Sequence, residues 1–232
     1  MKESSISATI TNIARIHTDF PTKFGVPRQS GLVSLKATIV FEPPYRDRSS
    51  IRGLEGFSHL WLIWQFSEAL GSKVSPTVRP PRLGGNTRMG VFATRSPFRP
   101  NHLGLSSVKL ESIEIDPLWG PVLHVSGADM IDQTPIFDIK PYLPFTDSHP
   151  DAAAGFAAFC MDEKLEVIFP SQWLRLIPEE LQRGLFEVLE MDPRPGYVND
   201  SDRIFGISFA GFDIRFIVAK GILTVVDIEC ID

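Results

Sequence analysis

The sequence predicts a mainly β protein, in which a closed or nearly closed N-terminal β-barrel precedes a smaller C-terminal α+β domain. Short runs of β-branched and aromatic residues, separated by Gly- and Pro-rich turns, fill the first 145 residues. No helical periodicity interrupts these runs, whereas such periodicity is clear between residues 171 and 191. Prolines and an alanine run at 144–154 resemble a linker. We therefore expect one domain over residues 1–145 and a second over residues 146–232.

The expected barrel contains about seven strands. Val108, Leu110, Ile113 and Ile115 show the period-two spacing of a half-buried strand, and residues 57–66 are apolar enough for burial on both faces. Several strands in succession without intervening helices favour a sheet that closes on itself. The expected strands lie at residues 6–15, 32–41, 57–66, 89–94, 107–115, 122–130 and 136–140.

The C-terminal domain combines helices with a small sheet. Apolar residues from Leu174 to Leu189 recur at helical spacing, and Pro178 divides this stretch into two helices because proline is tolerated only in a first turn. Residues 204–209, 214–219 and 223–228 then predict a three-stranded meander.

Composition indicates a globular cytoplasmic protein. Of the 232 residues, 43% are hydrophobic and 22% charged, close to globular averages. The first 18 residues lack the apolar segment of a secretory signal, and no apolar stretch approaches membrane-spanning length. Two cysteines are too few for a disulfide framework. We expect no membrane association.

Positive charge is concentrated in one part of an acidic chain. The net charge is −5, yet residues 69–110 contain seven basic side chains and no Asp or Glu. A local positive field of this kind could steer a phosphate-bearing partner, although scattered loop arginines or ion pairs with the acidic C-terminal half would give the same count.

Common cofactor and metal motifs are missing from the sequence. It contains no G-x-G-x-x-G, no P-loop and no paired-cysteine zinc pattern, and its five histidines are scattered. We therefore expect no metal site.

Five segments instead are rich in Arg, Asn, Asp, Gly and Pro, at residues 24–31, 79–86, 90–101, 129–135 and 138–144. Each could be an ordinary barrel turn with surface arginines. As connections between strands of one barrel, however, they could gather at a single rim, where binding residues concentrate.

These segments resemble the TsaA-like domain family of tRNA methyltransferases. The match includes residues 26–29 (Val-Pro-Arg-Gln), 56–61, 79–86, 90–101 and 138–142, in order, and residues 192–197 resemble a C-terminal block of bacterial members. The resemblance implies a homodimeric β-barrel enzyme that uses S-adenosylmethionine. It also implies methylation of N6 of N6-threonylcarbamoyladenosine, next to the anticodon of threonine tRNA. A non-catalytic barrel that binds S-adenosylmethionine or RNA, and a small-molecule methyltransferase, are the alternatives.

The resemblance also assigns site residues. Phe66 and Leu105 would enclose the adenine, Arg28 or Arg95 would pair with the methionine carboxylate, and Asp132 would accept from the ribose hydroxyls or the amino group. Gln133 departs from the family pattern, which often has Gly there. The full set of cofactor contacts is Pro27, Arg28, Gln29, Phe66, Ser67, Arg95, Leu105, Asp132, Gln133, Thr134 and Pro135.

Proton removal and RNA binding have separate candidates. Asp138, Lys140 and Tyr142 are polar and closely grouped, so each is a candidate to accept the N6 proton, with no sequence argument for choosing among them. The candidates for tRNA contacts are Arg82, Arg88, Arg99 and Arg194.

Overall fold

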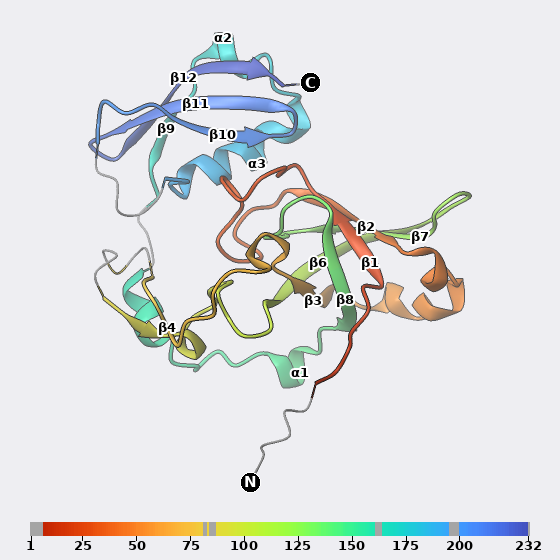
Figure 1. The fold of residues 1–232 in the computed structure, drawn as a ribbon. Coiled ribbons are helices and arrows are strands. Elements are labelled where there is room, and N and C mark those ends of the chain that lie inside the picture. The colour runs from red at the N-terminus through yellow and green to blue at the C-terminus, as the bar shows by residue number, and fades with distance from the viewer. Residues whose placement is uncertain (1–6, 81–82, 84–86, 161–163, 195–199, 232) are drawn as a thin grey trace.

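The computed structural model describes residues 7–80, 83, 87–160, 164–194 and 200–231. In Figure 1, a barrel formed by the N-terminal part of the chain lies below a separate C-terminal sheet with helix α3 beside it. The mainly β architecture with a smaller C-terminal α+β unit is thus confirmed.

Six strands of the described chain form the closed barrel, in the order β1-β2-β7-β6-β3-β8. Every pairing is antiparallel, and β1 closes the barrel by pairing with both β2 and β8. The strands are β1 (Ala14–His17), β2 (Lys36–Phe41), β3 (His59–Gln65), β6 (Leu103–Asp116), β7 (Gly120–Ser126) and β8 (Thr134–Pro141).

One of the seven expected barrel strands, at residues 89–94, is not part of the barrel, so that prediction is wrong. Only β5 (Met89–Gly90) is extended, and it pairs with the equally short β4 (Thr77–Val78) outside the barrel. A 3-10 helix, Val91–Ala93, follows because the Thr94 N–H donates to the Val91 carbonyl, which closes a tight turn instead of a ladder. Val91 is buried but the neighbouring Phe92 is 78% exposed.

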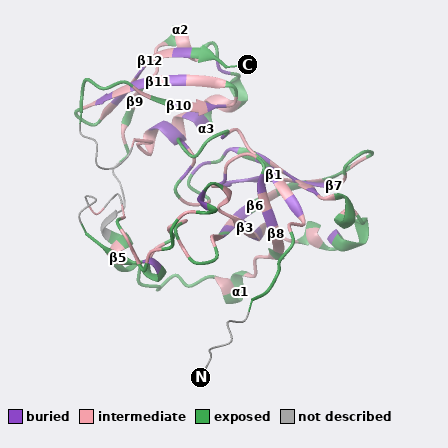
Figure 2. Ribbon diagram, viewed as in Figure 1, coloured by how far each residue is buried: buried purple, intermediate pink, exposed green. Residues whose placement is uncertain are grey.

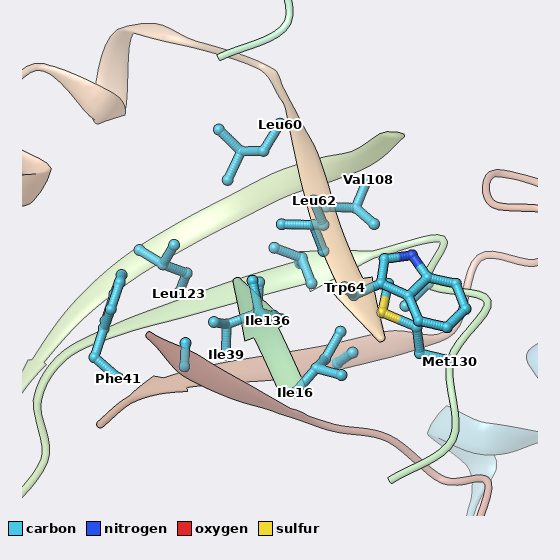
Figure 3. Close-up of a cluster of buried hydrophobic side chains, with 14 of the residues drawn as sticks. Ile16, Ile39, Phe41, Leu60, Leu62, Trp64, Val108, Leu123, Met130 and Ile136 are labelled. Carbon is cyan, nitrogen blue, oxygen red and sulfur yellow. The ribbon is translucent and has the colours of Figure 1, made fainter. Parts of the chain in front are cut away.

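Alternating residues of the strands fill the barrel. Leu60, Leu62 and Trp64 of β3 are buried while the residues between them are partly exposed, so β3 faces the core with one side only. The expected burial of this strand on both faces is therefore wrong. Figure 3 shows these side chains with Ile16, Leu123 and others inside the barrel, and the Trp64 indole beside Met130 at its end.

The C-terminal unit is a four-stranded sheet in the order β10-β11-β12-β9. The expected meander and the two helices on either side of Pro178 are confirmed, whereas β9, which pairs parallel with β12, was not predicted. These elements are β9 (Glu166–Ile168), α2 (Ser171–Leu174), α3 (Glu179–Glu190), β10 (Phe205–Phe209), β11 (Phe212–Ala219) and β12 (Ile222–Cys230); the short α1 (Pro144–Asp147) follows the barrel.

The segment between β1 and β2 packs into the C-terminal unit. Phe20, Val33 and Leu35 belong to the buried cluster of that unit, and the Phe20 and Phe209 rings meet at 5.6 Å. Leu35 occupies the space beside Gly184 of α3, where an added Cβ would lie 2.2 Å from Leu35 Cδ2. The buried residues in Figure 2 accordingly lie in both units and in the chain that connects β1 with β2. None of the helices in the described part of the chain has the length and apolar character needed to span a membrane.

Candidate cofactor cavity

A cavity of about 1070 Å³ lies where β3 ends and β6 begins. Three of the loop segments singled out in the sequence contribute to its wall: residues 26–29, most of residues 92–101, and residues 129–131 with Thr134. Strand pairing explains this convergence, because Gln65, at the end of β3, is opposite Leu103, at the start of β6. The loops that leave these two strand ends therefore meet.

Most of the predicted cofactor contacts lie in this wall. Arg28 and Gln29 come from the loop after β1, Phe66 and Ser67 follow β3, and Arg95 follows the 3-10 helix Val91–Ala93. The predicted residues that line the cavity are Pro27, Arg28, Gln29, Phe66, Ser67, Arg95, Leu105 and Thr134.

Asp132, Gln133 and Pro135 do not line the cavity. Asp132 Oδ1 accepts from the Thr18 N–H at 3.1 Å, and Gln133 Nε2 lies 3.0 Å from His17 Nδ1. Pro135 is opposite Arg15 in the pairing of β1 with β8. These three residues therefore face β1, and their contact with the cofactor stays a prediction.

A polar bridge crosses the cavity wall. The Arg95 guanidinium donates to Gln29 Oε1, and Gln29 Nε2 donates to the Arg28 carbonyl. Arg28 itself donates to the Asp192 carbonyl at 2.7 Å. Burial lowers the pKa of the Arg28 guanidinium, and the Asp192 carboxylate acts in the opposite direction. The loop at 27–29 is thereby tied both to the 95–101 loop and to the C-terminal unit.

Apolar and aromatic groups form the rest of the wall. The Trp64 and Phe66 rings meet at 4.3 Å, and Leu105 is 58% exposed on β6. Phe92 and Phe98 also line the cavity and are exposed. A concave site with mostly apolar walls and few polar groups is typical of small-molecule and cofactor binding.

Sequence reasoning missed several lining residues. Asp129 is the most informative, because it is a partly buried carboxylate beside Arg95, and burial raises its pKa. It opens the segment 129–135, so its position there was the available signal. Phe98 and Asn101 belong to the 90–101 segment, so they could have been included in the predicted site. The sequence around Trp64 indicated only a core residue.

The candidate proton acceptors lie next to the cavity but do not line it. Asp138 is opposite Ile63, a lining residue, and pairs with Lys140 at 3.0 Å. The Tyr142 ring lies 5.5 Å from that of Trp61, which also lines the cavity. All three thus occupy the neighbouring strand β8 and its end, and their roles stay predictions.

The four candidate RNA contacts differ in environment. Arg82 lies outside the described residues, and Arg88 is exposed, with a hydrogen bond of 2.9 Å to Thr77 Oγ1. Arg99 lines the cavity and donates to the Thr94 carbonyl. Arg194 has a side chain that is only 13% exposed and donates through two nitrogens to the Asp192 carboxylate, at 2.8 Å each. Arg88 is therefore the described candidate most available to a phosphate.

Two family models match the chain. The tRNA-methyltransferase O N-terminal domain matches residues 15–148, and the TrmO C-terminal domain matches residues 162–231. A relative from Escherichia coli, named tRNA (adenine(37)-N6)-methyltransferase, is 42% identical over 88% of this chain and 90% of its own. A human protein of the same name is 39% identical over 60% of this chain and 31% of its own.

A solved structure agrees with these matches. The crystal structure of TrmO from P. aeruginosa has a TM-score of 0.78 with 29% identity, and the similarity covers 99% of this chain and 100% of that one. The predicted resemblance to the TsaA-like family is confirmed, and the chain belongs to the tRNA-methyltransferase O (TrmO) family.

Proposed function

We propose that this protein is an S-adenosylmethionine-dependent tRNA methyltransferase that methylates N6 of N6-threonylcarbamoyladenosine, next to the anticodon of threonine tRNA. Membership of a family whose curated relatives are named tRNA (adenine(37)-N6)-methyltransferase supports this activity. The observation that carries the proposal is the convergence of Pro27–Gln29, Phe66, Arg95 and Leu105 on one cavity.

The cavity suits the proposed cofactor in size and in chemistry. Its volume of about 1070 Å³ slightly exceeds the usual range for ligand pockets, about 300–1,000 Å³, and leaves room for a cofactor together with the target base. S-adenosylmethionine has an apolar aromatic end and a charged amino acid end. Phe66 and Leu105 would contact the adenine, and Arg95 would form a charge-assisted hydrogen bond with the carboxylate.

The bound cofactor would supply a methyl group on a positively charged sulfur, so no protein nucleophile is required. The protein must place the target nitrogen in line with that methyl group and exclude water. Such positioning can contribute roughly 7–11 kcal/mol to lowering the barrier. The exposed rings of Phe92 and Phe98, which line the cavity, would help to exclude water from the reacting atoms.

A positive surface would hold the tRNA. The segment 69–110 contains seven basic residues and also supplies a large part of the cavity wall, including Arg95 and Arg99. This charge distribution favours a phosphate-rich substrate over a small metabolite.

Assembly and location complete the proposal. Large apolar side chains outside the cavity wall are also exposed, among them Leu118, Trp119 and Phe145, and a homodimer would cover side chains of this kind. We place this homodimer in the cytoplasm, where tRNA is available, and we divide each subunit into domains at residues 1–145 and 146–232.

The test is mass spectrometry of nucleosides from threonine tRNA incubated with protein and S-adenosylmethionine. A methylated form of N6-threonylcarbamoyladenosine is the expected product. The control is the same tRNA prepared without the threonylcarbamoyl group, which should remain unmethylated. Binding of cofactor and tRNA without any product would instead support the non-catalytic alternative.

A further inference from the structure

A chain of side-chain hydrogen bonds leads from the barrel core to the cavity wall. Trp64 Nε1 donates to Ser106 Oγ at 2.9 Å, and Ser106 Oγ donates to Asp129 Oδ1 at 2.6 Å. Ser106 is only 1% exposed, and Asp129 lines the cavity. The Ser106 hydroxyl, itself fixed by the Trp64 indole N–H, therefore holds the Asp129 carboxylate in one orientation.

The same carboxyl group lies in the cavity wall with the Gln29–Arg95 bridge. The Gly31 N–H donates to the Gly127 carbonyl at 2.9 Å, so the loop that holds Gln29 packs on the chain just before Asp129, and Gln29, Arg95 and Asp129 line the same cavity. The Ser30 backbone and the Arg95 guanidinium both act to lower the pKa of Asp129, against the larger effect of burial. Arg95 in turn donates to Gln29 Oε1. The Asp129 carboxyl group thus lies beside the two loops that would contact the cofactor.

We infer that Asp129 is a positioning residue, which holds the loop at 28–30 and Arg95 in the geometry that S-adenosylmethionine needs, while Ser106 and Trp64 orient Asp129 itself. This inference rests on the proposed function. Burial of a carboxylate opposes its ionisation, so a purely structural acceptor for Ser106 would be served better by a neutral amide. The charge is needed only for the groups on the cavity side.

Asp129→Asn separates these two roles. Asparagine keeps an oxygen that can accept from Ser106 but removes the charge that attracts Arg95. Ser106→Ala instead removes the hydroxyl that orients the carboxylate. The matched control is Ser126→Ala, because Ser126 is 8% exposed and donates to Glu111 Oε1 at 2.6 Å, but on β7 and not in the cavity wall.

Two measurements are made on the full-length chain: calorimetric binding of S-adenosylmethionine, and amide hydrogen exchange of residues 28–30 without cofactor. We expect Asp129→Asn to weaken binding by about tenfold or more, and Ser106→Ala by a few-fold. Exchange at 28–30 should be faster in both variants than in the wild type. Ser126→Ala should match the wild type in both measurements.

Unchanged exchange at 28–30 in Asp129→Asn would overturn the inference, and so would an equal loss of binding in Ser126→Ala. Wild-type protein that binds no S-adenosylmethionine would refute the proposed function instead. The exchange measurement, which needs no ligand, would still decide the role of Asp129 in that case.

Discussion

The Trp64 indole lies directly over Gly104, its partner on the neighbouring strand. A Cβ at position 104 would be 2.2 Å from Trp64 Cε2, far inside van der Waals contact. Trp64 also lines the cavity and donates to Ser106, so its position affects both the core and the site. The absence of a side chain at residue 104 is therefore a condition for the cavity wall to form.

Gly104→Ala should destabilise the protein by about 1–3 kcal/mol or more, because the added methyl group must displace a packed indole. Chemical denaturation measures this change. Gly56→Ala is the control, since a Cβ there meets nothing within 4 Å. Similar stability of the two variants would show that the indole can move away at little cost.

Arg95→Ala should weaken S-adenosylmethionine binding by about 1.5–3 kcal/mol through loss of a charge-assisted hydrogen bond. Calorimetry measures the affinity, and Arg183→Ala, on the exposed face of α3, serves as a charge-matched control. An affinity equal to that of the wild type would show that Arg95 does not contact the cofactor.

Arg88→Ala should leave the cofactor affinity intact and reduce tRNA binding. If Arg88 contacts one phosphate, the log–log salt dependence should flatten by about one unit. The measurement is tRNA affinity at several salt concentrations. An unchanged slope would mean that the hydrogen bond of Arg88 to Thr77 is its whole role.

Arg194→Ala should act on stability and leave the salt slope unchanged. Its partly buried ion pair with Asp192 contributes roughly 1.5–3 kcal/mol at most, because hydrogen bonds to a charged partner are stronger than neutral ones. Thermal melting and the same salt series distinguish this from a phosphate contact, for which the slope would fall.

Titration of Asp129 should affect stability and cofactor binding in opposite directions: as pH rises, its contribution to the free energy of unfolding should fall while cofactor binding strengthens. Burial raises its pKa above 3.8, so the folded state keeps the proton to higher pH than the unfolded state does. The contribution of this group to the free energy of unfolding is therefore largest below about 4 and falls as pH rises towards the folded pKa. Cofactor binding, which needs the ionised form beside Arg95, should strengthen over the same range. Asp129→Asn should remove both dependences.

Local patterns predicted the parts of the molecule that depend on neighbours in sequence. The period-two spacing in β6 and the helical spacing around Pro178 correspond to observed elements, and the apolar run at 57–66 correctly predicted the strand β3 but not that one of its faces is partly exposed. β9 has only three residues, too few for a pattern, and exists because β12 pairs with it. Residues 89–94 carried strand-like composition, yet β4 offers a partner for only two of them.

Loop composition likewise predicted most of the cavity wall, but not the connections beneath it. Trp64 and Ser106 are 42 residues apart, and Ser106 and Asp129 are 23 apart. No local spacing links such residues, so the hydrogen-bond chain becomes visible only once β3 and β6 pair.

The loop at 26–29 is anchored at both ends in the C-terminal unit, as well as by hydrogen bonds to the barrel. Phe20 and Val33, on either side of it, are buried there, and Gly25 lies against Ile207. If the C-terminal unit contacts RNA and changes its orientation on binding, Arg28 and Gln29 would therefore move with it. Thermodynamic reciprocity then requires that RNA and cofactor change each other's affinity by the same factor. We expect this coupling factor to differ from one. RNA binding at the C-terminal unit would then change the affinity of the cavity for the cofactor.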